Sequence, residues 1–288
     1  MDFVEIIKAV FIGFIQGVTE WLPVSSTGHM IIAEEFVNLK ISDPAWELFS
    51  VITQLGSILA VLILFFDKLN PFSKNKTEEL KSKTWSLWLK VIVACIPAAV
   101  MGLLFDDFLT EKLYNFIVVS IALVVYGILF IVIERANKKK YAESGFPISD
   151  VYEIGFGDAL KIGLFQVLAL IPGTSRSGST ILGSSLIGVG RTAAAEFSFF
   201  LAIPVMLGAS ALKVVKFIMG TSAGEISPLN STEITVIIVG TAVAFVVSLF
   251  AVKLLMSFIK EKTFEGFGWY RIGLGGFLLI YYIIKNLV

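Results

Sequence analysis

Apolar residues run through this chain in stretches that are too long and too uninterrupted for a soluble protein. The composition agrees, because 56% of the 288 residues are hydrophobic and only 16% are charged, whereas a typical soluble domain has about 25% charged residues. A helix needs about 20 mostly apolar residues to cross a bilayer. Such stretches cover residues 47–66, 86–104, 114–134, 195–217, 233–256 and 266–286. The pattern predicts an all-α polytopic membrane protein, with residues 1–288 forming a single membrane domain.

Two further apolar regions, residues 3–31 and 156–190, are each broken near the middle. The first break runs from Pro23 to Gly28 and the second from Pro172 to Thr180, and both are rich in Pro, Gly, Ser and Thr. Each half is too short to span, and irregular backbone at membrane depth is tolerated only inside protein or beside water. We therefore expect each region to form a re-entrant pair of half-helices.

The two broken regions resemble each other at an offset of about 150 residues, since Gly13 to Gln16 matches Gly163 to Gln166. We interpret residues 1–134 and 150–286 as two repeats, each a re-entrant pair followed by three transmembrane helices. Because each repeat has an odd number of spans, the second repeat crosses the membrane in the opposite orientation to the first. Lysine and arginine favour cytoplasmic loops, and eleven of them lie in the expected inside loops against five outside. Those inside loops are 67–85, 135–155 and 257–265. The charge count therefore supports an orientation in which the first tip is reached from outside and the second from inside. Paired breaks in an inverted repeat point to a binding site near the membrane midplane.

The breaks carry chemically useful side chains. An unpaired arginine near mid-depth costs at least about 2.5–3.5 kcal/mol in lipid, so Arg176 indicates a site that binds an anion, and a phosphate suits it best. If the tips meet, one chamber holds a carboxylate, an imidazole, an arginine and hydroxyls, which suits phosphoryl transfer. The first tip supplies Gln16, Glu20, Ser25, Ser26, Thr27 and His29, and the second supplies Ser175, Arg176, Ser177 and Thr180.

Simpler roles compete with the catalytic one. Arg176 would also serve as a structural partner that locks the second tip to Glu20, and a lone histidine is more often structural than catalytic. His29 is the single histidine of the chain, which excludes a site with several histidine ligands. The net charge is zero, so nothing indicates a nucleic-acid partner. The Gly173 to Thr180 segment lacks the lysine of a nucleotide-binding P-loop.

The segments from Gln16 to His29 and from Pro172 to Thr180 resemble the bacterial undecaprenyl-diphosphate phosphatases, the BacA or UppP bacitracin-resistance family. The resemblance covers essentially the whole length. It implies a multi-pass hydrolase of the bacterial inner (plasma) membrane, embedded in the lipid bilayer. The enzyme would convert undecaprenyl diphosphate to undecaprenyl phosphate and inorganic phosphate, recycling the lipid carrier of peptidoglycan synthesis and conferring bacitracin resistance. A homodimer is a further expectation.

The resemblance also implies roles for individual residues. The catalytic set is Glu20, Ser26, His29 and Arg176, with Arg176 holding the diphosphate and Ser26, His29 or a water attacking it. Activity in the family depends on a divalent cation, magnesium or calcium; Glu20 is the candidate ligand, and Gln16, an uncharged amide, is a poor one. Phosphate contacts are assigned to the residues Ser25, Thr27, Ser175, Arg176, Ser177 and Thr180.

Two rival functions remain at this stage. Inverted repeats with broken helices are typical of transporters, so a flippase for the lipid carrier is the main alternative. A purely structural membrane subunit is the weaker one, because it does not explain an arginine in apolar sequence. Movement of undecaprenyl phosphate across liposomes by an inactive His29 variant would separate transport from hydrolysis.

Overall fold

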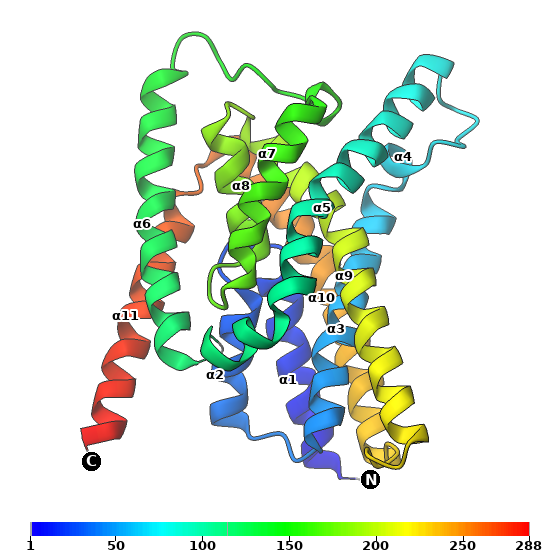
Figure 1. Cartoon of the computed structure of the whole chain (residues 1–288). Coiled ribbons are helices and arrows are strands. Elements are labelled where there is room, and N and C mark those ends of the chain that lie inside the picture. Colours follow the sequence, from blue (N-terminus) through cyan, green and yellow to red (C-terminus); the bar gives the residue numbers. More distant parts are fainter. Residues whose placement is uncertain (1, 114, 288) are drawn as a thin grey trace.

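The computed structural model describes residues 2–113 and 115–287, and side chains within them except at 106–108, 110, 286 and 287. These residues form a bundle of helices without a β-sheet (Figure 1). The α-helices are α1 (Phe3–Thr19), α2 (Ser26–Val37), α3 (Asp43–Leu64), α4 (Phe66–Leu69), α5 (Glu78–Leu113), α6 (Phe116–Lys140), α7 (Phe156–Val167), α8 (Arg176–Leu186), α9 (Arg191–Ser222), α10 (Ser231–Glu261) and α11 (Glu265–Leu287).

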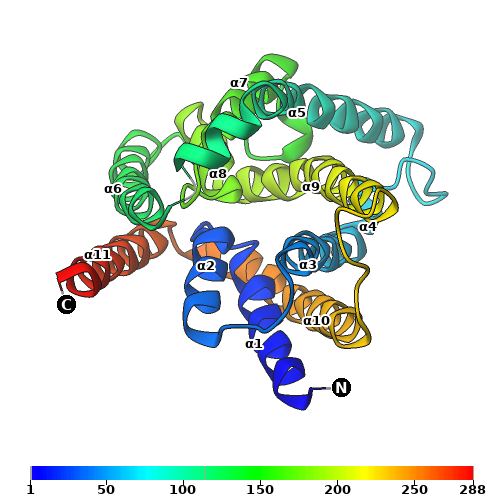
Figure 2. The same cartoon turned by 60° about the horizontal axis from the view of Figure 1, so that its bottom comes forward.

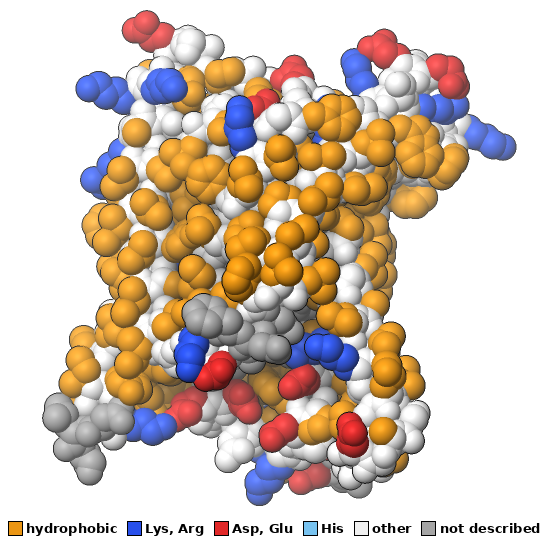
Figure 3. All heavy atoms as spheres, in the orientation of Figure 1, with side chains coloured by type: hydrophobic (Ala, Val, Ile, Leu, Met, Phe, Trp, Pro, Cys, Tyr) orange, Lys and Arg blue, Asp and Glu red, His pale blue; other side chains and the backbone are white. Residues whose placement is uncertain are grey.

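The prediction of membrane-spanning helices is confirmed. Within the described residues, 6 helices are long and apolar enough to cross a membrane, and they lie in α3, α5, α6, α9, α10 and α11. Helix α5 begins at Glu78, eight residues before its predicted apolar stretch. Its polar first turns are supported by ion pairs three and four residues apart, Lys81 with Glu78 and Lys83 with Glu79. Charged side chains gather at the two ends of the molecule, with a hydrophobic belt between them (Figure 3). This chain is a multi-pass membrane protein.

Both broken regions form pairs of short helices, as predicted. Helices α1, α2, α7 and α8 have 17, 12, 12 and 11 residues, which at about 1.5 Å per residue is short of a bilayer core of about 30 Å. In Figure 1, α1 and α2 enter from the end that holds both termini, whereas α7 and α8 enter from the opposite end. The two tips lie near the middle of the molecule. Symmetry between residues 1–134 and 150–286, and the orientation in the membrane, stay predictions.

Glycines allow the half-helices to pack directly on spanning helices. A Cβ at Gly13 of α1 would lie 2.5 Å from the Gly240 carbonyl oxygen of α10, and one at Gly163 of α7 would lie 2.4 Å from the Ala94 carbonyl oxygen of α5. Such close backbone contacts require glycine and are typical of helix packing in membranes. Figure 2 shows α1 beside α10 and α7 beside α5. These contacts set the rotation of both half-helices about their axes, and thereby the direction of their polar side chains.

Candidate active site

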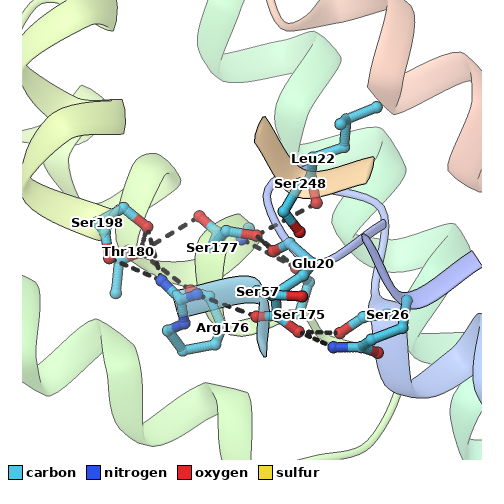
Figure 4. Close-up of polar contacts among 12 residues, drawn as sticks. Glu20, Leu22, Ser26, Ser57, Ser175, Arg176, Ser177, Thr180, Ser198 and Ser248 are labelled. Carbon is cyan, nitrogen blue, oxygen red and sulfur yellow. Dashed lines mark hydrogen bonds and ion pairs between the residues drawn. The ribbon is translucent and has the colours of Figure 1, made fainter. Parts of the chain in front are cut away.

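The two tips contact each other, which is the condition on which the predicted shared chamber depended. Arg176 at the start of α8 donates from Nη2 to Glu20 Oε1 at the end of α1, over 3.1 Å. The Ser177 hydroxyl donates to the carbonyl oxygen of Leu22, over 3.2 Å (Figure 4). Arg176 and Glu20 form an ion pair whose side chains are only 11% and 3% exposed. Residues about 156 positions apart are thus joined in one polar cluster inside the bundle.

A serine in an unusual backbone conformation precedes each returning half-helix. Ser25 (φ 74°) caps α2 and Ser175 (φ 75°) caps α8, and each hydroxyl accepts from the backbone N–H three residues later. Positive φ is uncommon for residues other than glycine, and such strain concentrates at functional sites. The caps bring the N-termini of α2 and α8 to the contact between the tips. Helix N-termini carry partial positive charge and free N–H groups, so they favour an anion there.

Glu20 is the acceptor at the centre of the cluster. While its Oε1 accepts from Arg176, its Oε2 accepts from the Ser26 hydroxyl and from Gln16 Nε2, each over 2.9 Å. Gln16 and Glu20 are four residues apart on one helical face. A serine hydroxyl that donates to a buried carboxylate has the arrangement of a nucleophile beside its base.

The guanidinium of Arg176 is oriented from the other side by α9. Its Nη1 donates to the Ser198 carbonyl oxygen over 2.7 Å, and the Thr180 hydroxyl donates to Ser198 Oγ over 2.7 Å. The guanidinium also lies over the Trp21 ring, 5.8 Å from its centre. Its buried Nε has no hydrogen-bond partner among the described residues. The side chain is therefore held in place with one donor still unused.

A cavity of about 190 Å³ lies between the tips, and it brings together most of the predicted site. Residues of α3, α5, α7 and α9 complete its walls. The predicted residues that line it are Glu20, Ser25, Ser26, Thr27, Ser175, Arg176 and Ser177. Gln16 and Thr180 stand behind this layer, bonded to Glu20 and to Ser198.

His29 is turned away from the cavity toward α11. Its Nδ1 lies 2.8 Å from the Ser25 carbonyl oxygen and its Nε2 lies 2.7 Å from the Tyr270 hydroxyl. A carbonyl oxygen only accepts, so Nδ1 carries the hydrogen, and in the neutral ring Nε2 accepts from Tyr270. The two rings are stacked, 5.7 Å apart and within 6° of parallel. His29 thus supports the strained Ser25 turn from behind.

Comparison with known proteins identifies the family of this chain. The family described as "Bacitracin resistance protein BacA" matches residues 9–277. This chain belongs to the BacA family. It is 52% identical over 282 residues to the undecaprenyl-diphosphatase of Enterococcus faecalis, covering 97% of this chain and 98% of the relative. It is 52% identical over 279 residues to the undecaprenyl-diphosphatase of Acetivibrio thermocellus (97% and 98% covered), and 47% identical over 288 residues to that of Streptococcus gordonii (100% and 99% covered).

The structure adds residues of this BacA-family site that the sequence reasoning did not select. Arg271 of α11 is fully buried and donates to the carbonyl oxygens of Pro23, Gly173 and Thr174, over 3.0, 2.8 and 2.9 Å. Arg271 thus joins the two tips just before Ser25 and Ser175, the serines with positive φ. The available signal was an arginine inside an otherwise apolar span, which calls for a functional explanation. Gln166, which lines the cavity, had appeared only as the repeat counterpart of Gln16.

The donor atoms of the site determine which cation it would suit. Among the described residues no three His, Cys, Asp or Glu side chains come together as a metal site, and Glu20 is the one carboxylate that lines the cavity. Magnesium is commonly held by one or two carboxylates together with substrate phosphates rather than by an all-protein cage. Glu20 and the cavity hydroxyls are oxygen donors of the kind that magnesium and calcium take, and both oxygens of Glu20 accept hydrogen bonds from protein groups in this structure. A divalent cation stays a prediction.

Proposed function

We propose that this chain is an undecaprenyl-diphosphatase of the bacterial inner membrane, which releases inorganic phosphate from undecaprenyl diphosphate and confers bacitracin resistance. The observation that carries the proposal is the convergence of Arg176, Glu20 and Ser26 on one buried cavity. Relatives named undecaprenyl-diphosphatase, 47–52% identical over nearly the full length, support the same reaction. The product is the monophosphate carrier that peptidoglycan synthesis reuses.

Binding of the diphosphate is the first task of the site. The guanidinium of Arg176, which lines the cavity, and the N-termini of α2 and α8 provide positive charge and N–H donors. The hydroxyls of Ser25, Thr27 and Ser175 line the same cavity and supply further donors. An entering phosphate competes with Glu20 for the guanidinium, and the carboxylate stays hydrogen-bonded to Ser26.

The geometry supports Ser26 as the nucleophile. Its Oγ attacks the terminal phosphorus, its proton passes to Glu20 Oε2, and the bond from that phosphorus to the bridging oxygen breaks. Undecaprenyl phosphate leaves with the electron pair of that bond. Water then attacks the phosphoserine phosphorus, and the bond from that phosphorus to Ser26 Oγ breaks. Glu20 returns its proton to Oγ, the water's displaced proton passes to solvent, and inorganic phosphate departs. The hydrogen bond of 2.9 Å between Ser26 and Glu20 is the contact that supports this assignment.

Three supporting parts complete the proposal. A divalent cation, magnesium or calcium, would enter with the diphosphate and supply charge neutralisation; Glu20 Oε1, the oxygen that Arg176 contacts, is the candidate ligand atom, which leaves Oε2 for Ser26. Gln16 serves Glu20 as a donor rather than as a ligand. His29 acts as a positioning residue for Ser25. The apolar chain of the substrate lies in lipid and in the groove of about 740 Å³ that Leu22 lines beside α10.

Phosphate release from undecaprenyl diphosphate by the detergent-purified protein tests the proposal. The wild type should release phosphate with magnesium or calcium and should stop when a chelator is added. Arg176→Ala should lose about 100- to 1,000-fold in kcat, the range for removing a donor that stabilises developing charge. Arg135→Ala is the matched control, because that arginine pairs with Glu265 at the surface and is 62% exposed.

Further arms separate the chemical alternatives. Ser26→Ala should abolish release, and rapid acid quenching of the wild type should trap phosphoserine at position 26. A rate close to wild type in Arg176→Ala or in Ser26→Ala would contradict the mechanism. Movement of undecaprenyl phosphate across liposomes without any hydrolysis would favour the flippase. Light scattering of the purified protein tests the proposed homodimer.

A further inference from the structure

Gln166 of α7 is a buried amide without a protein partner. Its side chain lines the cavity between the tips and the residue is only 2% exposed. Neither Oε1 nor Nε2 makes a hydrogen bond within the part of the chain that the structure describes. A buried polar group without a partner costs about 1–3 kcal/mol, and native proteins rarely retain one without a reason. The position of Gln166 at the cavity indicates that its partner is a ligand.

The first tip contains a comparison for this amide. Gln16 occupies the matching place in the Gly13 to Gln16 segment, 150 residues earlier, and its Nε2 donates to Glu20 over 2.9 Å. Four residues after Gln166, where the first tip has Glu20, the chain carries Leu170, whose apolar side chain cannot accept a hydrogen bond. The close packing of Gly163 against α5 fixes the rotation of α7, so Gln166 is held on the cavity side. The Gln16 amide thus bonds within the protein, whereas the Gln166 amide is available to a substrate.

The neighbours of Gln166 identify the chemistry of that ligand. Glu20, Ser26 and Arg176 line the same cavity. An amide offers two N–H donors and one acceptor oxygen, which suits a phosphate oxygen on one side and a water on the other. Resting on the proposed diphosphatase function, we propose that Gln166 contacts the substrate: Nε2 donates to a phosphate oxygen, and Oε1 accepts from the water that hydrolyses the phosphoserine.

Gln166→Leu separates this role from a structural one. Leucine has a similar size and no polar atoms, so it removes two unpaired groups and should leave the melting temperature unchanged or higher. The same change should lower kcat/KM for undecaprenyl diphosphate about 10- to 100-fold, as expected for one lost hydrogen bond to a charged group. Gln16→Leu is the matched control: its amide is paired, so it should lose thermal stability together with activity.

A binding measurement keeps the test independent of turnover. Inorganic pyrophosphate with magnesium should raise the melting temperature of the wild type and raise that of Gln166→Leu by less. Wild-type kinetics together with an equal pyrophosphate effect in Gln166→Leu would overturn the proposal, as would an activity loss that only follows lost stability. A wild type that releases no phosphate from undecaprenyl diphosphate overturns the proposed function; Gln166 is then judged by the pyrophosphate shift alone.

Discussion

Replacement of Arg271 by methionine tests whether the clamp between the tips stabilises the fold. The side chain is 0% exposed, and its guanidinium donates to the carbonyl oxygens of Pro23, Gly173 and Thr174. Methionine fills similar space but donates nothing, so three buried carbonyl groups lose a partner at about 1–3 kcal/mol each. Removal of the desolvation penalty of the buried charge offsets part of this sum. We expect a net loss of about 3–5 kcal/mol, the lower part of the range for three unpaired carbonyl groups once this offset is subtracted.

That loss is large enough to measure as a melting temperature. A loss of about 1 kcal/mol lowers the melting temperature by about 2–4 °C for a chain of this order of size. Arg271→Met should therefore melt about 6–20 °C below the wild type when unfolding is monitored by tryptophan fluorescence in detergent. Arg271→Lys, which keeps the charge but not the planar fork of donors, should fall between the two. Phosphate release at a temperature where every variant is folded should also drop, since Ser25 and Ser175 follow the clamped carbonyl groups.

The control for this experiment is Arg135→Met. That arginine pairs with Glu265 at the surface and is 62% exposed, and exposed ion pairs contribute about 0–1 kcal/mol. Its melting temperature should therefore stay within about 2 °C of the wild type. If Arg271→Met also melts within 2 °C of the wild type, the clamp contributes no stability and the reasoning from its hydrogen bonds fails.

Two further predictions concern the backbone of the half-helices. Gly163→Ala should lower the melting temperature, because its Cβ would lie 2.4 Å from the Ala94 carbonyl oxygen, whereas Gly157→Ala on the same helix meets nothing within 4 Å and should be neutral or stabilising. Ser175→Gly should be more stable than Ser175→Ala by about 1 kcal/mol, because glycine accepts the φ of 75° and loses little as an N-cap. Equal melting temperatures within either pair would refute the corresponding argument.

Much of the fold follows from local properties of the chain. Long apolar stretches become helices in lipid because their backbone groups must bond within the same segment, so six spans were predictable without any tertiary contact. The breaks were predictable too, because Pro23 and Pro172 interrupt helices that hydroxyl residues then restart. The ion pair between Glu20 and Arg176 corresponds to the structural alternative considered for Arg176, and it avoids leaving either charge unpaired at that depth.

The roles of the individual side chains were decided by packing. Ser26 and His29 are three residues apart, yet Ser26 bonds Glu20 while His29 bonds Tyr270. Periodicity places residues on a helical face, but it does not set which neighbour that face meets.

The sequence by itself determined the membrane class, the spans, the two breaks and the inventory of polar groups, because each depends on the composition of a short segment. Only the tertiary structure decided that Gln166 lines the cavity without a protein partner among the described residues and that the Thr180 hydroxyl bonds Ser198. It also decided that Arg271 bonds carbonyl groups of both tips. These outcomes depend on the rotation and depth of helices far apart in the chain. Both are set by close contacts between helix backbones, as at Gly163.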